Sequence, residues 1–197
     1  MYEVEIRALV KDFDDVKKKL DGFATPTSPS AREVTIFFFN PYNDNYDIRL
    51  ILRKNKFILG YKEKLSKKAR KEIESDISNP DAIYDLLTHS GFEIRMIVAR
   101  VKYLYQYENY KILLNRIIDW GDAIEVEILI EEEKDVDIIE KNIKNFMLSK
   151  LEISELLENH TLQSMNGDYC KKINFNNILL KDLLDYVYGK KNDLRFI

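Results

Sequence analysis

Two segments of the chain place glutamates at alternate positions, a spacing that could hold metal ions. Glu3 and Glu5 open the chain together with Arg7, and Glu125 and Glu127 recur much later. Because successive side chains of a β-strand point to opposite faces, each pair of glutamates would share one face of its strand. Carboxylate oxygens are preferred ligands of hard divalent cations. The segments therefore suit a metal site if these faces turn inward, and an ordinary solvated surface if they turn toward water.

Basic side chains alternate in the same way along the segments between these glutamates. They are Arg49, Arg53, Lys62, Lys64, Arg70, Arg100 and Lys102. Arginine binds phosphate through paired N–H groups, lysine adds a point charge, and Mg²⁺ or Mn²⁺ bridges phosphate oxygens to carboxylates. So many charges on inward faces would be costly unless a bound partner offset them. We therefore expect a polyphosphate ligand bound together with Mg²⁺ or Mn²⁺.

The composition excludes several other kinds of site. The 31 Lys and Arg residues nearly balance the 34 Asp and Glu residues, so the overall charge neither favours nor excludes an anionic partner. A single cysteine, Cys170, excludes an internal disulfide framework, and His89 and His160 are too few for a histidine cluster. The sequence shows no signal segment and no stretch long enough for a membrane span. This predicts a cytoplasmic protein without a membrane partner.

The hydrophobic pattern indicates strands up to about residue 131 and helices after it. Period-two alternation predicts eight strands, and links as short as Lys54-Asn55-Lys56 make the sheet largely antiparallel. The expected strands are 1–9, 33–39, 46–54, 57–64, 69–77, 97–107, 110–119 and 123–131. Together with the helices, they predict the α+β class.

Helical spacing predicts several helices beside this sheet. One begins at Asp12, and another begins at Asn79-Pro80, where proline suits the first helical turn. Apolar residues from 136 to 146 indicate a third, Leu156 and Leu157 are assigned to a further helix, and residues 178–187 form the last.

These elements predict two parts of the chain. Residues 1–165 are expected to form the main domain, and residues 166–197 a helical extension. The apolar stripe of the last helix needs a partner surface, which is either the outside of the sheet or a second subunit in a homodimer.

The strands have one apolar face and one charged face. Helices could cover the apolar faces while the charged faces curl around a cavity. A row of tyrosines, Tyr103, Tyr105 and Tyr107, is expected on the apolar side as part of the core. Closure would bring the first and last strands together, and with them the two pairs of glutamates. We therefore predict an eight-stranded antiparallel closed β-barrel with flanking helices.

Four motifs, in order, resemble those of one enzyme superfamily. Glu3-Val4-Glu5-Ile6-Arg7 resembles the opening Glu-x-Glu-x-Lys signature of the CYTH or triphosphate tunnel metalloenzyme superfamily. Gly60-Tyr61-Lys62-Glu63 resembles its Tyr-Lys strand, and Arg70-Lys71-Glu72-Ile73-Glu74 resembles its Arg-x-Glu-x-Glu strand. Trp120-Gly121-Asp122-Ala123-Ile124-Glu125-Val126-Glu127 resembles its Leu-Gly-x-Phe-x-Glu-x-Glu ending. The resemblance spans about residues 1 to 130.

The resemblance implies a triphosphate tunnel and a divalent-metal-dependent triphosphatase. Its substrate would be inorganic triphosphate, a nucleoside triphosphate or thiamine triphosphate. The implied metal ligands are Glu3, Glu5, Glu72, Glu74, Glu125 and Glu127. The implied triphosphate-binding residues are Arg7, Arg49, Arg53, Lys62, Arg70, Arg100 and Lys102. Glu5, Arg7 and Lys62 are the expected catalytic residues.

The chain also departs from the family pattern. Arg7 stands where the family usually has lysine, and Asn115 stands where it commonly has aspartate. Asp119 shares the strand parity of Asn115 and could compensate for the lost carboxylate. Two other functions stay open. One is a class IV-type adenylate cyclase that makes cyclic AMP and pyrophosphate. The other is a weakly catalytic protein that binds polyphosphate or the 5′-triphosphate end of RNA, the one nucleic-acid partner expected.

Overall fold

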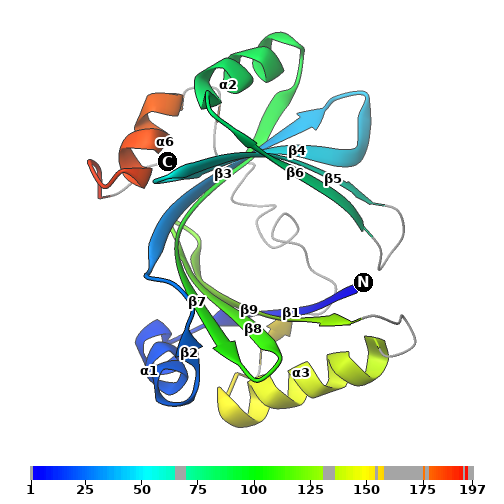
Figure 1. The fold of residues 1–197 in the computed structure, drawn as a ribbon, viewed down its shortest axis with the longest axis vertical. Coiled ribbons are helices and arrows are strands. Elements are labelled where there is room, and N and C mark those ends of the chain that lie inside the picture. Colours follow the sequence, from blue (N-terminus) through cyan, green and yellow to red (C-terminus); the bar gives the residue numbers. More distant parts are fainter. Residues whose placement is uncertain are drawn as a thin grey trace. The chain divides into compact units, whose positions relative to one another are not determined.

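A computed structural model describes residues 2–64, 70–130, 136–153, 155–157, 175, 178–192 and 194. The side chains of Tyr2, Glu3, Lys64, Arg70 and Ile130 lie outside this description. The described residues form helices and a largely antiparallel sheet, which confirms the α+β class (Figure 1).

All eight predicted strands are present, each shifted by a few residues at most. They are β1 (Tyr2–Val10), β3 (Ala31–Asn40), β4 (Asn43–Arg53), β5 (Lys56–Lys64), β6 (Arg70–Ile77), β7 (Glu93–Tyr107), β8 (Tyr110–Ile117) and β9 (Gly121–Ile130). Two strands of two residues each were not predicted. They are β2 (Thr25–Pro26), which pairs with β7, and β10 (Leu156–Leu157), which pairs with β1. The assignment of Leu156 and Leu157 to a helix was therefore wrong.

The prediction of a closed eight-stranded barrel was also wrong. In the described part of the chain the sheet has ten strands, and their order is β10-β1-β9-β8-β7-β3-β4-β5-β6, with β2 beside β7. The first and last predicted strands do pair, because β1 lies antiparallel to β9. The other edge of β1 pairs at Arg7 and Ala8 with β10. The order of paired strands therefore has two ends, β10 and β6, instead of closing.

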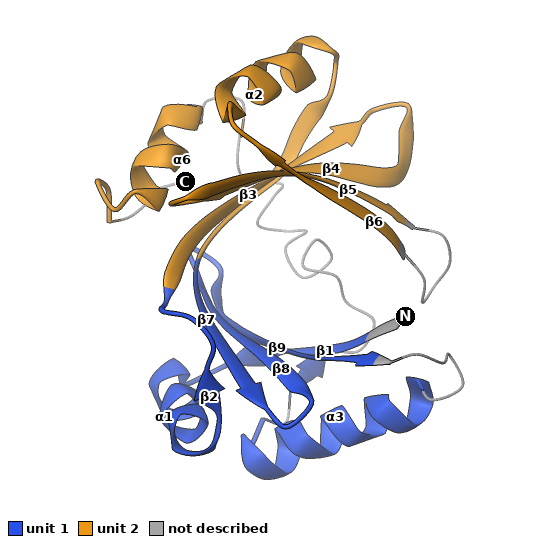
Figure 2. Ribbon diagram, viewed as in Figure 1, with its two compact units in different colours: residues 1–30, 101–165 blue, residues 31–100, 166–197 orange. Residues whose placement is uncertain are grey.

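The chain divides into two compact units, coloured in Figure 2. Unit 1 consists of residues 1–30 and 101–165, and unit 2 consists of residues 31–100 and 166–197. Strand β7 contributes its first part to unit 2 and its second part to unit 1. We describe each unit by itself below.

Unit 1 packs two helices on the apolar face of its strands. Helix α1 (Phe13–Phe23) begins after Asp12, whose side chain caps it by accepting a bond from the Asp15 N–H. Helix α3 (Val136–Lys150) packs on β1 and β9. Figure 2 shows both helices on the same side of the unit 1 strands. Their core is built from alternate strand residues, such as Val4 and Ile6, and from Leu20 and Met147 of the helices. The two helices therefore cover the apolar face, as predicted, and do not cover the charged face.

The tyrosine row of β7 lies against the helices, as predicted. Tyr103 meets Phe13 edge to face, and Tyr105 is 3% exposed. The Tyr105 hydroxyl donates a 2.9 Å hydrogen bond to Asp21 of α1, which also pairs with Lys17. Burial, followed by this bond, raises the pKa of Tyr105 well above its usual range. The bond from Lys17, followed by that from Tyr105, lowers the pKa of Asp21.

The Tyr105→Phe variant tests this bond. A carboxyl group whose pKa is lowered by folding stabilises the protein above its unfolded pKa of about 3.9, and this stabilisation is lost as the pH falls further. We expect Tyr105→Phe to lower the free energy of unfolding by about 1 kcal/mol at pH 7 and by less near pH 3. Urea unfolding at both pH values, with Tyr103→Phe as the control, measures this. An equal loss at both pH values would show that the charge on Asp21 is not involved.

Unit 2 also carries its helices on one face of its strands. Helix α2 (Pro80–His89) begins after Asn79, whose side chain caps it, and it contacts β4. Helix α6 (Leu180–Val187) contacts β3 and β4, so its apolar stripe packs on the sheet, one of the two partner surfaces considered above. Arg32 fixes the end of α6 by donating to the Tyr186 carbonyl at 3.2 Å and to the Lys191 carbonyl. No helix among the described residues is both long and apolar enough to cross a membrane.

Candidate functional site

The charged face of unit 1 is built by alternate residues of β1, β9 and β8. Glu5 lies directly opposite Glu127 across the β1–β9 ladder, and Arg7 lies directly opposite Glu125. Like charges that face each other across two strands are destabilising unless a cation lies nearby. Glu5, Glu125 and Glu127 thus share one face of neighbouring strands.

A basic side chain and an amide hold the most buried carboxylate of this face. Glu125 is 8% exposed, and its Oε2 lies 3.4 Å from Arg7 Nε, while another nitrogen of Arg7 pairs with Glu5. Asn115 is fully buried, and its Nδ2 donates a 3.2 Å hydrogen bond to Glu125 Oε1. The side-chain oxygen of Asn115 is buried without a hydrogen-bond partner among the described residues. A buried oxygen of this kind is a candidate ligand for a cation or a water.

The donor types of this face fit a hard divalent cation. Glu5, Glu125, Glu127 and the Asn115 amide all offer oxygen. Each glutamate also has a basic or amide neighbour in the structure, since Glu127 pairs with Lys111. Among the described side chains, which do not include that of Glu3, no three Asp, Glu, His or Cys residues are grouped closely enough to hold a metal ion. The oxygen donors of this face therefore suit Mg²⁺ or Mn²⁺. In the structure, however, the described carboxylates pair with basic or amide side chains and are not grouped around one point.

Unit 2 carries a second charged cluster on β4, β5 and β6. Asp47, Lys62 and Glu72 lie opposite one another across the three strands. Lys62 Nζ is 3.3 Å from Glu72 Oε1, and Arg49 reaches the same oxygen at 3.7 Å. Asp47 holds Arg49 through two bonds, of 2.5 Å to Nε and 3.3 Å to Nη2. The side chains of Lys62 and Arg49 remain about one-fifth exposed, at 19% and 21%. The structure therefore brings together Arg49, Lys62 and Glu72, three of the predicted residues.

Gly60 lies within this cluster, opposite Arg49 on one side and Glu74 on the other. Its φ is not positive, and an added Cβ would meet Arg49 Cβ at 3.6 Å and Glu74 Cγ at 3.9 Å, which are ordinary contacts. Neither the backbone nor the packing therefore requires glycine at this position. A glycine within a strand can instead mark the close approach of a ligand.

The Gly60→Ala variant tests whether glycine is structurally needed. Because alanine loses less backbone entropy than glycine on folding, we expect the free energy of unfolding to rise by about 0.5–1 kcal/mol. Guanidinium unfolding of the variant and the wild type measures the difference. A loss of stability would show that the fold itself needs this glycine.

A third cluster joins two more of the predicted arginines of unit 2, Arg53 and Arg100. Glu33 of β3 is directly opposite Arg53 and accepts its Nε–H at 2.6 Å. Arg100 of β7 donates to the same carboxylate through two N–H groups. The sequence analysis did not select Glu33 or Asp47. Both residues alternate with apolar residues, and this pattern could have marked them as candidates. Their arginine partners could not be predicted without the strand register.

Several predicted residues are less well placed or lie outside the description. The side chains of Glu3, Lys64 and Arg70 are outside it. Glu74 is exposed on β6, and Lys102 is half-buried on the unit 1 part of β7. Asp119 has a positive φ of 59° and follows the end of β8 at Ile117, so it belongs to the turn. The alternation of β8 ends at Ile117, so Asp119 does not lie on the same strand face as Asn115. Asp119 therefore does not replace the missing carboxylate.

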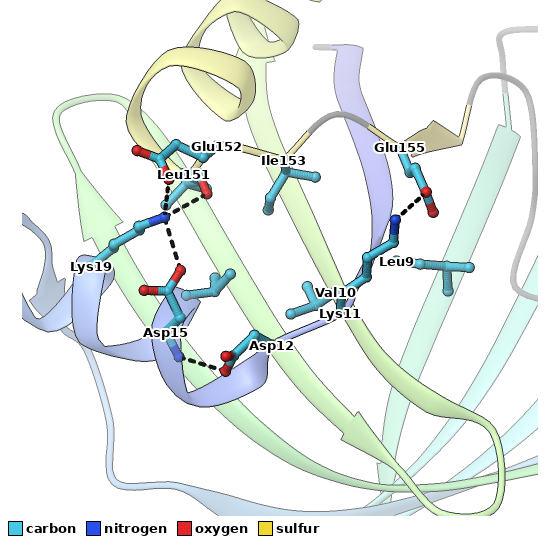
Figure 3. A pocket seen from close by; sticks show the side chains of 11 residues that line it. Leu9, Val10, Lys11, Asp12, Asp15, Lys19, Leu151, Glu152, Ile153 and Glu155 are labelled. Carbon is cyan, nitrogen blue, oxygen red and sulfur yellow. Dashed lines mark hydrogen bonds and ion pairs between the residues drawn. The ribbon is translucent and has the colours of Figure 1, made fainter.

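A pocket of unit 1 lies away from these clusters, on the helix side (Figure 3). It is lined by the end of β1, the start of α1 and the segment after α3. Its charges pair with one another, since Lys19 lies 2.9 Å from Asp15 and 2.8 Å from Glu152, and Lys11 lies 2.5 Å from Glu155. None of the predicted site residues lines this pocket.

Solved structures with the same fold support the resemblance seen in the motifs. No protein-family model and no curated protein matches the chain. The PH1012 protein from Pyrococcus horikoshii OT3 is 22% identical, with a TM-score of 0.69 over 87% of this chain and 99% of that one. A proposed adenylate cyclase from Vibrio parahaemolyticus is 14% identical, with a TM-score of 0.69 over 85% and 98%.

A plant protein has the same fold. HpAC1 from Hippeastrum, a proposed adenylyl cyclase described as revealing a dominant triphosphatase activity, is 17% identical. Its TM-score is 0.58 over 85% of this chain and 96% of that one. At these identities the likeness concerns the fold. The chain thus shares its fold with proteins described as proposed adenylate cyclases, one of which is described with a dominant triphosphatase activity.

Proposed function

We propose that the protein hydrolyses a triphosphate in a reaction that depends on Mg²⁺ or Mn²⁺. The observation that carries the proposal is the face of unit 1, where Glu5 and Glu127 are directly opposite each other beside the Arg7–Glu125 pair. Two facing carboxylates repel each other, and a bound cation would offset this repulsion. The shared fold and the ordered motifs support triphosphate chemistry rather than an ordinary solvated face.

The reaction consumes one water molecule. The water oxygen would attack the terminal phosphorus, the bond from that phosphorus to the bridging oxygen would break, and diphosphate and orthophosphate would leave when inorganic triphosphate is the substrate. Glu5 would accept the proton of the water as a general base. Glu3, Glu5, Glu125 and Glu127 of unit 1 would hold a metal ion, which would supply positive charge against the phosphate oxygens. Glu72 and Glu74 of unit 2 are separate candidate ligands.

The basic side chains would bind the phosphate oxygens. They are Arg7, Arg49, Arg53, Lys62, Arg70, Arg100 and Lys102. Three of these arginines donate Nε–H to a carboxylate: Arg49 to Asp47, and both Arg53 and Arg100 to Glu33. Arg7 is held by its ion pairs with Glu5 and Glu125. Such anchoring reduces the conformational entropy that is lost when an anion binds. Fixed positive charges of this kind stabilise the negative charge that develops during phosphoryl transfer.

Phosphate release by the purified protein tests the proposal. Inorganic triphosphate, ATP and thiamine triphosphate are each incubated with Mg²⁺, with Mn²⁺ and with a chelator, and the products are identified. We expect orthophosphate from at least one substrate, and only when a metal is present. Cyclic AMP with pyrophosphate would establish the cyclase instead. Triphosphate binding without any product would establish a binding protein.

Asn115 favours the binding protein as the second candidate. It stands where the family commonly has aspartate, and its amide nitrogen is already bonded to Glu125. An amide at this position supplies an oxygen but no charge for a metal ion. If the wild type binds triphosphate without turnover, the Asn115→Asp variant is expected to create activity.

The Asn115→Asp variant also reports on metal binding. It replaces a bonded amide by a carboxylate that faces Glu125 in a fully buried position. Without metal we expect the free energy of unfolding to fall by about 3 kcal/mol, because the buried Glu125 carboxylate loses its amide donor and faces a second carboxylate. Bound Mg²⁺ should restore most of this loss. Thermal unfolding with chelator and with Mg²⁺ measures both effects, and Asn115→Leu, which adds no charge, is the control. If Mg²⁺ leaves the melting temperature of Asn115→Asp unchanged, no cation binds beside Glu125.

A further inference from the structure

One buried carboxylate joins two of the arginines expected to bind triphosphate. The Glu33 side chain is 2% exposed and accepts Arg53 Nε at 2.6 Å, Arg100 Nε at 3.0 Å and Arg100 Nη2 at 2.6 Å. The three side chains come from the neighbouring strands β3, β4 and β7 of unit 2. Two guanidinium charges and one carboxylate charge leave the cluster with a net positive charge, which favours an anionic ligand.

The two arginines differ in how much of them reaches solvent. The Arg53 side chain is 40% exposed, whereas that of Arg100 is 12% exposed. Glu33 accepts the Nε–H of Arg53, and Arg53 pairs with no other side chain among the described residues. Its terminal nitrogens therefore keep N–H groups with which to bind a ligand, while its Nε is fixed.

Stability alone does not explain a glutamate at this position. Removing the Glu33 carboxylate and the Arg100 guanidinium group from water costs about as much as their attraction returns, and well-packed apolar residues often stabilise a core at least as well. A cluster that fixes the direction of planar guanidinium groups has a clearer benefit for recognition, because arginine binds phosphate in defined geometries.

We propose that Glu33 is a positioning residue that holds Arg53 and Arg100 for adjacent phosphoryl groups of one polyphosphate. The inference rests on the proposed function and adds a source of ligand selectivity to it. Because one carboxylate anchors both guanidinium groups, it also sets the spacing between them. A ligand with several linked phosphoryl groups can place a separate group against each arginine, whereas orthophosphate has a single group to offer.

The Glu33→Gln variant separates positioning from simple charge. Loss of the carboxylate makes the cluster more positive, so charge alone predicts that the variant binds triphosphate more tightly. Loss of positioning predicts the opposite, because the neutral amide offsets neither guanidinium charge and its NH2 group replaces one of the two acceptor oxygens that Glu33 gives to Arg53 and Arg100. The direction of the change in affinity therefore decides between the two explanations.

The Glu33→Asp variant provides an independent comparison. It keeps the negative charge, but its side chain is shorter by one methylene group and has less reach toward two arginines on different strands. Charge alone predicts unchanged binding, and positioning predicts weaker binding. The control for lost stability is Val34→Ala, which removes apolar volume from the neighbouring, fully buried residue on the opposite face of β3.

The experiment measures binding by calorimetry for the wild type and the three variants. The ligands are a non-hydrolysable imido analogue of inorganic triphosphate, with Mg²⁺, and orthophosphate. We expect Glu33→Gln and Glu33→Asp to bind the analogue about 10–100-fold more weakly, as is typical when a supporting residue is lost, and to lose most of the preference over orthophosphate. Val34→Ala should bind like the wild type despite a lower melting temperature.

The outcomes separate this inference from the proposed function. If the wild type does not bind the analogue, the proposed function fails, and the positioning role fails with it. If the wild type binds and Glu33→Gln binds equally well or better, only the positioning role is overturned. If Glu33→Gln does not fold, Glu33→Asp decides in the same way, and its unchanged affinity would overturn the role.

Discussion

Replacing Glu5 by glutamine is expected to reduce metal-dependent phosphate release by about 10²–10⁴-fold, the range typical of a lost general acid or base. Glutamine keeps the size of the side chain but cannot accept the proton of the attacking water, and it is a weaker ligand for Mg²⁺ or Mn²⁺. Steady-state rates with saturating triphosphate and metal measure the effect. The loss should appear mainly in kcat.

The fold should tolerate this change. Glu5 is paired with Arg7 but is also directly opposite Glu127, so its neutralisation removes one favourable and one unfavourable interaction. We therefore expect the melting temperature to change little. The matched control is Glu155→Gln, which removes a glutamate of unit 1 that pairs with Lys11 beside the helix-side pocket. If Glu5→Gln keeps the wild-type kcat, the acidic face of unit 1 is not the catalytic site.

Replacing Lys62 by methionine is expected to weaken triphosphate use by about 10²–10³-fold in kcat/KM. Lys62 Nζ lies 3.3 Å from Glu72 Oε1, and the Lys62 side chain is 19% exposed. Across β4 and β5, Lys62 is opposite Asp47, which binds Arg49. Methionine preserves the apolar stem, so the change removes mainly the charge that would stabilise the phosphate oxygens in the transition state. Initial rates over a range of triphosphate concentrations separate kcat from KM.

The same strand provides a control for this variant. Lys56 also lies on β5 and also pairs with a carboxylate of β6, at 2.9 Å from Asp76, but its side chain is 50% exposed. Lys56 and Lys62 are an even number of positions apart on β5, so they share a face of the strand. Lys56→Met should leave kcat/KM within about twofold of the wild type, since an exposed charge of this kind contributes little. Equal losses in the two variants would indicate a general effect of charge instead of a specific site.

The sequence predicted the eight long strands because apolar and polar residues alternate along most of them. On β1, for example, Val4 and Ile6 enter the core while Glu5 and Arg7 stay on the charged face. The pairing of β1 with β9 was predicted from closure of the sheet, and it is present although the sheet does not close. The two-residue strands β2 and β10 could not be predicted, since a pair of residues has no periodicity. Closure failed as a prediction for a related reason, because β10 takes part of the free edge of β1.

The site was predicted less completely than the strands. Arginines were visible as candidates, but the carboxylates that hold them were not. Glu33 contacts Arg53, which is 20 residues away, and Arg100, which is 67 residues away. Contacts over such distances depend on strand order and register, which a single sequence does not contain. Asp119 failed for a local reason, since the positive φ in the turn ends the alternation on which its assignment depended.

In the proposed reaction, water attacks the terminal phosphorus of a bound triphosphate. The most direct measurement incubates the wild-type protein with ATP and Mg²⁺ in water enriched in ¹⁸O and determines by mass spectrometry which product carries the label. We predict one ¹⁸O atom in the released orthophosphate, none in ADP, and no product when the metal is chelated. Unlabelled pyrophosphate accompanied by cyclic AMP would contradict the claim, because the ribose hydroxyl would then have replaced water as the nucleophile.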